Sequence, residues 1–226
     1  MLRNRFRLGH LLGGLSLALA SLAAQADFAN GITVNLIAPG GIVDDPTPIA
    51  LSQAVAFADL ASGVQAGNLG GAGDISAFML DDERIFFSGT MILMRVAVGD
   101  TTNDVWTTGY LGSGGEHARY QFDGIAFTGR VITGILVYAY DGFATSGPAS
   151  ASGLLSPADP MVLVHQVDAD SIAFDLDTLV FKQRFAGQAN NFAEFRIDLV
   201  TAPVPEPAVS LLLAAGLLVV LRRRRG

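Results

Sequence analysis

Nine short segments rich in β-branched and aromatic residues, separated by clusters of Gly, Pro, Asp and Asn, constrain the fold of this chain most strongly. This pattern is typical of strands joined by turns. It does not provide the repeated helical crossovers that a parallel α/β sheet needs. We therefore expect a mainly β domain, an antiparallel β-sandwich or jelly roll. The expected strands cover residues 32–37, 75–80, 84–88, 91–98, 119–127, 131–140, 161–167, 172–185 with a break, and 192–200.

Side-chain alternation supports the last of these strands, because Ala193, Phe195, Ile197 and Leu199 interleave with mostly charged residues. Residues 47–61 fit two structures and stay open. Thr47 and Pro48 suit the start of a helix, whereas the apolar residues that follow alternate as in a strand. Residues 74–78, 123–127 and 170–174 share the pattern Asp-x-x-Ala-Phe, which we interpret as similar strand openings rather than an internal repeat.

The N-terminus has the three regions of a secretory signal. Arg3, Arg5 and Arg7 precede an apolar stretch over residues 11–22, and Ala24-Gln25-Ala26 has the small-x-small form that signal peptidase accepts. Cleavage is expected after Ala26, with Ala24 and Ala26 as the recognition residues. An uncut N-terminal anchor is the alternative, but the apolar run is short for a membrane span. The organisation is then a signal peptide over residues 1–26, one β-rich extracytoplasmic domain over 27–201, and a tail over 202–226.

The tail has three parts in order. Pro205-Glu206-Pro207 interrupts regular structure, residues 208–221 form an apolar run, and Arg222, Arg223, Arg224 and Arg225 follow. The run would extend about 21 Å as a helix, short of a hydrocarbon core of about 30 Å. Consecutive arginines favour the cytoplasmic side of a membrane. We thus expect a signal helix and a C-terminal hydrophobic helix on either side of the β domain.

This tail resembles the PEP-CTERM sorting signal of exported bacterial proteins, a tail family also catalogued as an ice-binding protein C-terminal domain. The resemblance implies that an exosortase recognises Pro205, Glu206 and Pro207 and cuts nearby. The apolar helix and the arginines would be discarded, and the protein would pass from the inner membrane to the cell surface or the extracellular matrix. The alternative is a C-terminal membrane anchor that is never cut. Regular Thr-x-Thr arrays, which would support ice binding, are absent from the middle of the chain.

The part of the chain between the leader and the tail carries a strong negative charge. All 21 Asp and Glu lie between Asp27 and Glu206, whereas three of the 14 Lys and Arg are in the leader and four in the tail, so this part has a net charge of −14. Such a surface disfavours nucleic acid and anionic lipid as partners. The chain has no cysteine, so disulfides, thiolate metal sites and cysteine nucleophiles are excluded.

Two D-x-D pairs, Asp168 with Asp170 and Asp175 with Asp177, are the candidate calcium ligands. Carboxylates two residues apart in a strand share one face, where a hard cation would relieve their repulsion. The spacing does not match an EF-hand, and solvated surface acids are the simpler interpretation, so we expect no cofactor. Asp44-Asp45 and Asp81-Asp82-Glu83 are expected to be solvated loop charges.

Enzyme activity is not expected. No G-x-S-x-G or HExxH motif occurs, His165 lies in an apolar run, and His117 follows a glycine pair in a loop. The alternative is a secreted hydrolase that cuts polysaccharide with a pair of carboxylates, as glycosidases do. Trp106 and Tyr110, in a polar glycine-rich stretch, are the best candidates for exposed aromatic residues that bind a ligand, whereas covering the edge of the core is the simpler interpretation of both. We expect a noncatalytic surface or matrix protein associated with exopolysaccharide, whose other partners are the secretion machinery, signal peptidase, an exosortase and, before processing, the membrane.

Overall fold

The computed structural model describes residues 27–67, 73–81, 83–101, 105–140, 153–182 and 192–204. This part is mainly β with antiparallel sheets, as the turn-separated segments predicted. Within it no helix is long and apolar enough to cross a membrane. The expected signal helix over 1–26 and the hydrophobic helix over 208–221 lie outside these ranges.

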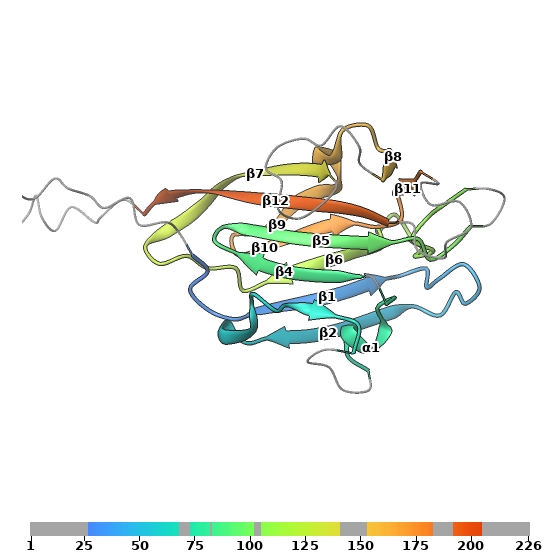
Figure 1. Ribbon diagram of the computed structural model, residues 1–226, viewed down its shortest axis with the longest axis horizontal. Coiled ribbons are helices and arrows are strands. Elements are labelled where there is room, and N and C mark those ends of the chain that lie inside the picture. Colours follow the sequence, from blue (N-terminus) through green and yellow to red (C-terminus); the bar gives the residue numbers. More distant parts are fainter. Residues whose placement is uncertain are drawn as a thin grey trace, which may run out of the picture.

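Two five-stranded sheets make up most of the structure, with their strands along its long axis (Figure 1). The β1 sheet has the order β2-β1-β6-β10-β9, and the β5 sheet has the order β3-β4-β5-β12-β7. The β1 sheet consists of β1 (Ile32–Ala38), β2 (Ile49–Val55), β6 (Arg119–Asp123), β9 (Val164–Asp168) and β10 (Ser171–Asp175). The β5 sheet consists of β3 (Val64–Gln65), β4 (Arg84–Ser88), β5 (Met91–Ala97), β7 (Arg130–Tyr140) and β12 (Phe192–Pro203). A small separate pair joins β8 (Leu154–Ser156) and β11 (Val180–Phe181).

One hydrophobic core lies between the two large sheets. Alternate residues of β1, from Ile32 to Ala38, are buried, as are alternate residues of β4, whereas β5 is buried on both faces except at Met91 and Arg95. The ring of Phe174 on β10 meets that of Phe195 on β12 edge to face, with centroids 4.8 Å apart, and Phe122 and Phe87 make a similar contact at 6.1 Å. Because each contact joins one sheet to the other, these rings hold the sheets together.

The predicted alternation on β12 is confirmed for its inner face. Ala193, Phe195, Ile197 and Leu199 are all buried. On the other face Glu194 and Arg196 are buried and Glu194 forms an ion pair with Arg95, whereas Val200 is 44% exposed. This strand lies between β5 and β7, so its charged residues are partnered within the sheet rather than solvated.

Several predicted strands differ in the structure, and the largest correction concerns residues 75–80. They form α1 (Ile75–Phe78), not a strand. Ile75 and Met79, one helical turn apart, both enter the core, and the side chain of Gln53 accepts a hydrogen bond from the Ser76 N–H. Burial of this pair overrides the local preference for a strand.

Other segments keep their β character with different bounds. The expected strand over 161–167 begins as the short 3-10 helix η3 (Pro160–Leu163), because Pro160 fixes its backbone and Asp159 accepts a bond from the Met161 N–H. The strand over 172–185 breaks at a turn after Asp175 and resumes as β11, and that over 119–127 ends at Asp123. Residues 47–61, left open by the sequence, contain β2 followed by the 3-10 helix η1 (Phe57–Asp59).

Candidate functional site

Three loops at one end of the molecule enclose a pocket of about 210 Å³, which we call the end pocket. They are the β1–β2 loop, the segment from α1 to β4, and the chain that follows β5, all at the right of Figure 1. Hydrogen bonds from the Val43 N–H to the Gly109 carbonyl (3.0 Å) and from the Leu111 N–H to the Gly41 carbonyl (2.9 Å) join the first loop to the third. The lining residues are Ile42, Val43, Asp44, Phe78, Leu80, Glu83, Gly99, Asp100, Thr108, Gly109 and Tyr110.

Close backbone approach makes glycine necessary in this wall. A Cβ on Gly99 would lie 2.2 Å from the Thr108 carbonyl oxygen, far inside van der Waals contact. Gly109 has a φ of +78°, a left-handed conformation that glycine adopts at low cost. These two positions allow the loop to turn back against the end of β5.

Two aromatic rings stack at the pocket. The centroids of Phe78 and Tyr110 are 6.2 Å apart, with an interplanar angle of 28°. Of the two interpretations of Tyr110, the position at the core holds, since it is 7% exposed and forms part of the hydrophobic core. Phe78, at 40% exposure, presents the accessible ring instead. Trp106 is half-buried against the core and does not line this pocket.

Glu83 lies at the inner end of the pocket and is 2% exposed, so the expectation of a solvated loop charge is wrong. Its carboxylate accepts hydrogen bonds from the Leu80 N–H (3.1 Å) and the Ala97 N–H (3.2 Å). Burial raises its pKa to about 7, although these two donors oppose the shift. Burial and the nearby Glu83 charge also raise the pKa of the Tyr110 phenol.

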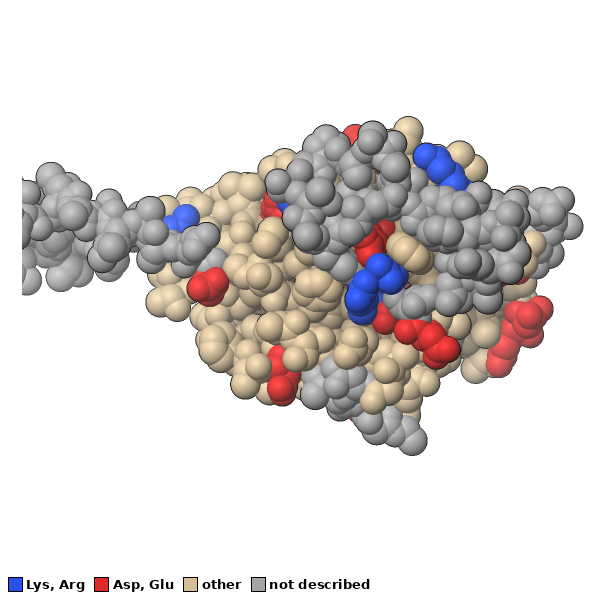
Figure 2. Space-filling model, viewed as in Figure 1, with Lys and Arg blue, Asp and Glu red and all other residues tan. Residues whose placement is uncertain are grey.

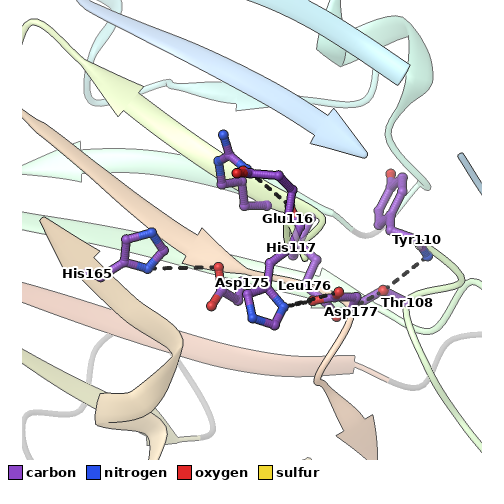
Figure 3. Close-up of polar contacts among 9 residues, drawn as sticks. Thr108, Tyr110, Glu116, His117, His165, Asp175, Leu176 and Asp177 are labelled. Atoms are coloured by element: carbon purple, nitrogen blue, oxygen red, sulfur yellow. Dashed lines mark hydrogen bonds and ion pairs between the residues drawn. The ribbon is translucent and has the colours of Figure 1, made fainter. Parts of the chain in front are cut away.

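The two histidines of the predicted domain lie on one face together with two of the predicted calcium ligands (Figure 3). The His117 Nδ1 is 3.0 Å from the Asp177 Oδ1, and the His165 Nδ1 is 3.9 Å from the Asp175 Oδ1. We call these four residues the His–Asp face. Burial raises the pKa of Asp175, and the two imidazoles oppose this shift. Both histidine side chains are 52% exposed, so the loop position expected for His117 is confirmed.

Thr108 links the end pocket to the His–Asp face, as Figure 3 shows. Its hydroxyl donates to the Leu176 carbonyl (3.1 Å) and accepts from the Tyr110 N–H (3.3 Å). Leu176 lies between Asp175 and Asp177, so this hydrogen bond joins the wall of the pocket to the backbone of the His–Asp face. Because Thr108 and Leu176 are far apart in the sequence, the sequence alone does not indicate that they are in contact.

The four candidate calcium ligands do not form one cluster. Asp168 and Asp170 are exposed at the β9–β10 turn, whereas Asp175 and Asp177 follow at the far end of β10 beside the histidines. Across the described ranges, no group of three or more His, Asp or Glu is arranged to hold a metal ion. Figure 2 shows acidic side chains at several separate places on one face of the molecule. The interpretation as solvated acids holds for Asp168 and Asp170 and is wrong for Asp175, which is 7% exposed.

Gly112 should tolerate no side chain, because it lies against the His–Asp face. A Cβ there would be 2.4 Å from the Asp177 Oδ2 and 2.6 Å from the Glu116 carbonyl oxygen. We expect Gly112→Ala to lower the free energy of unfolding by about 1–2 kcal/mol, measured by urea denaturation. Gly134→Ala in β7 is the control, since its nearest neighbour would be at 3.7 Å. Equal stability of the two variants would contradict this packing.

The residues predicted for processing lie outside the described ranges. They are Ala24, Ala26, Pro205, Glu206, Pro207 and Arg222 to Arg225. In comparisons with known proteins, no family model, curated protein or solved structure matches this chain.

Proposed function

We propose that this chain is an exported, noncatalytic surface or matrix protein whose β domain, a sandwich or jelly roll, binds exopolysaccharide at the end pocket. The observation that carries the proposal is the exposed Phe78 ring, stacked on Tyr110 at a pocket that also contains carboxylates. Sugar rings have apolar faces that pack on aromatic rings and hydroxyls that donate to carboxylates. At about 210 Å³, the pocket is smaller than a site for a drug-sized ligand and suits a single small unit of a polymer.

Delivery to the surface rests on the two ends of the sequence. The tripartite leader and the tail that resembles a PEP-CTERM signal support export, recognition by an exosortase and release from the inner membrane. An uncut C-terminal anchor is the alternative. Intact-mass measurement of the exported protein distinguishes them, because loss of the four terminal arginines is expected after sorting and their retention would contradict it.

Binding at the pocket is tested by replacing its exposed ring. We expect Phe78→Ala to weaken retention of the full-length protein on the producing cell's polysaccharide by about fivefold to thirtyfold, because a stacking contact of about 1–2 kcal/mol is lost. Phe57→Ala is a matched control, since Phe57 is 59% exposed and lies outside the pocket. Absence of retention by the unmodified protein would contradict the proposal.

A secreted hydrolase is a second candidate, and Glu83 is the observation that favours it. A carboxyl with a pKa near 7, in a pocket that also contains Asp44 and Asp100, has the property required of a general acid. However, both Glu83 oxygens accept backbone hydrogen bonds, which favours a structural role. A turnover assay on the retained polysaccharide separates the candidates, because release of shortened oligosaccharides, lost in Glu83→Gln, is expected only of the hydrolase.

A further inference from the structure

The charge of the end pocket has one sign. Among the described residues that line it, Asp44, Asp100 and Glu83 are carboxylic acids and none is Lys, Arg or His. Asp44 and Asp100 supply the negative charge, because Glu83, whose pKa is about 7, is protonated in mildly acidic solution. The three come from different loops, and no motif in the sequence groups them. Because like charges gathered in a partly enclosed site repel one another, such a site attracts a cationic group and disfavours an anionic one.

The three carboxyl groups lie at different depths in the end pocket. Asp44 is exposed in the β1–β2 loop, Asp100 is half-buried after β5, and Glu83 is buried below them. An ammonium group carries three N–H donors and no acceptor. Among the lining residues, Asp44 and Asp100 carry carboxylate oxygens that can accept from such a group.

The aromatic rings add a second, independent preference for a cation. Phe78 and Tyr110 both line the pocket, and their rings are nearly parallel at 28°. The face of an aromatic ring attracts an ammonium group through its quadrupole. A hard metal ion would gain nothing from these rings, and no metal-binding group of three is formed by the described acids and histidines. The pocket therefore suits an organic cation.

We propose that the end pocket binds the protonated amino group of an amino-sugar unit in a polysaccharide. The proposal rests on the proposed function and names its ligand class. An N-acetylated unit is neutral and bulkier at the same position, so it lacks the charge–charge attraction to the carboxylates. The pocket thereby distinguishes a de-N-acetylated polymer from its acetylated form.

The test compares two probes on the full-length protein in mild detergent: a glucosamine oligomer and the N-acetylglucosamine oligomer of the same length. Under mildly acidic conditions, in which the amine is protonated, calorimetry should show at least about tenfold tighter binding of the glucosamine oligomer. The double variant Asp44→Asn with Asp100→Asn should reduce this preference to about twofold or less. Asp168→Asn with Asp170→Asn is the control, because it removes the same charge from exposed positions outside the pocket.

The other outcomes decide between the two proposals. Equal affinity for both oligomers would overturn the preference for a cation while leaving polysaccharide binding at the pocket intact. Failure of both oligomers to bind, with the producing cell's polysaccharide still retained, would also overturn the amino-sugar ligand alone. The control variant could weaken the preference for the glucosamine oligomer as much as the pocket variant does. This result would mean that the acidic surface as a whole attracts the oligomer, and it would contradict a binding site in the pocket. Failure to retain the cell's polysaccharide would contradict the proposed function itself.

Discussion

Replacing Phe174 with alanine should lower the free energy of unfolding by about 3–5 kcal/mol. Phe174 is fully buried on β10, and its ring meets the buried Phe195 of β12 edge to face at 4.8 Å. The substitution removes the apolar ring, leaves a cavity between the two large sheets, and breaks a contact that joins them. Urea denaturation followed by circular dichroism measures the effect.

Two further variants make this expectation specific. Phe174→Leu retains most of the apolar volume and should cost distinctly less than the alanine variant. Phe57→Ala removes the same ring from a 59% exposed position and should change the free energy of unfolding by less than about 0.5 kcal/mol. If Phe174→Ala were no more costly than Phe57→Ala, the packing of β10 against β12 would be wrong.

The β character of the chain was predictable because burial on one face leaves a period of two in the sequence. The buried apolar residues of β12 recur at every second position, as predicted. The predicted strand over 84–88 has the same bounds as β4. The Asp-x-x-Ala-Phe pattern shows where local sequence stops being decisive. It opens a strand only at 170–174, where β10 follows; residues 74–78 contain α1 and residues 123–127 follow the end of β6, so the interpretation as similar strand openings is wrong for these two. Ile75 and Met79, one helical turn apart, are both buried, as are Ile172 and Phe174 on one strand face.

The candidate sites were harder to predict, because they join residues far apart in the chain. Asp44 and Tyr110 are brought together by backbone hydrogen bonds between their loops, and the Glu83 carboxylate is held by the Ala97 N–H; such bonds leave no sequence pattern. Tyr110 was a candidate ligand-binding residue and does line the pocket, but it is buried, as the simpler interpretation predicted. A signal for Glu83 was present: it stands two residues before the buried Ile85, in phase with the inward face of β4.

The buried position of Glu83 also has a consequence for stability. Its pKa is raised from 4.5 to about 7 in the folded protein, chiefly by burial. Between these two pH values the folded state holds the proton more tightly than the unfolded chain. The contribution of Glu83 to the free energy of unfolding therefore decreases as the pH rises across this window, by about 3 kcal/mol in all, and is constant above it.

The difference between the unmodified protein and Glu83→Gln isolates this contribution from those of the other acids. Glutamine stays neutral, so the free energy of unfolding of the variant lacks this decrease with pH. The glutamine side chain can accept only one of the two hydrogen bonds from the Leu80 and Ala97 N–H groups. The loss of that hydrogen bond lowers the free energy of unfolding of the variant by the same amount at every pH. We thus expect the stability advantage of the unmodified protein to shrink by about 3 kcal/mol between about pH 4.5 and pH 7, measured by urea denaturation at several pH values. Glu116→Gln is the control for removing a glutamate from the surface, since the Glu116 side chain is 69% exposed. A difference that stays constant over this range would mean that Glu83 is solvated and that the loops do not close over it.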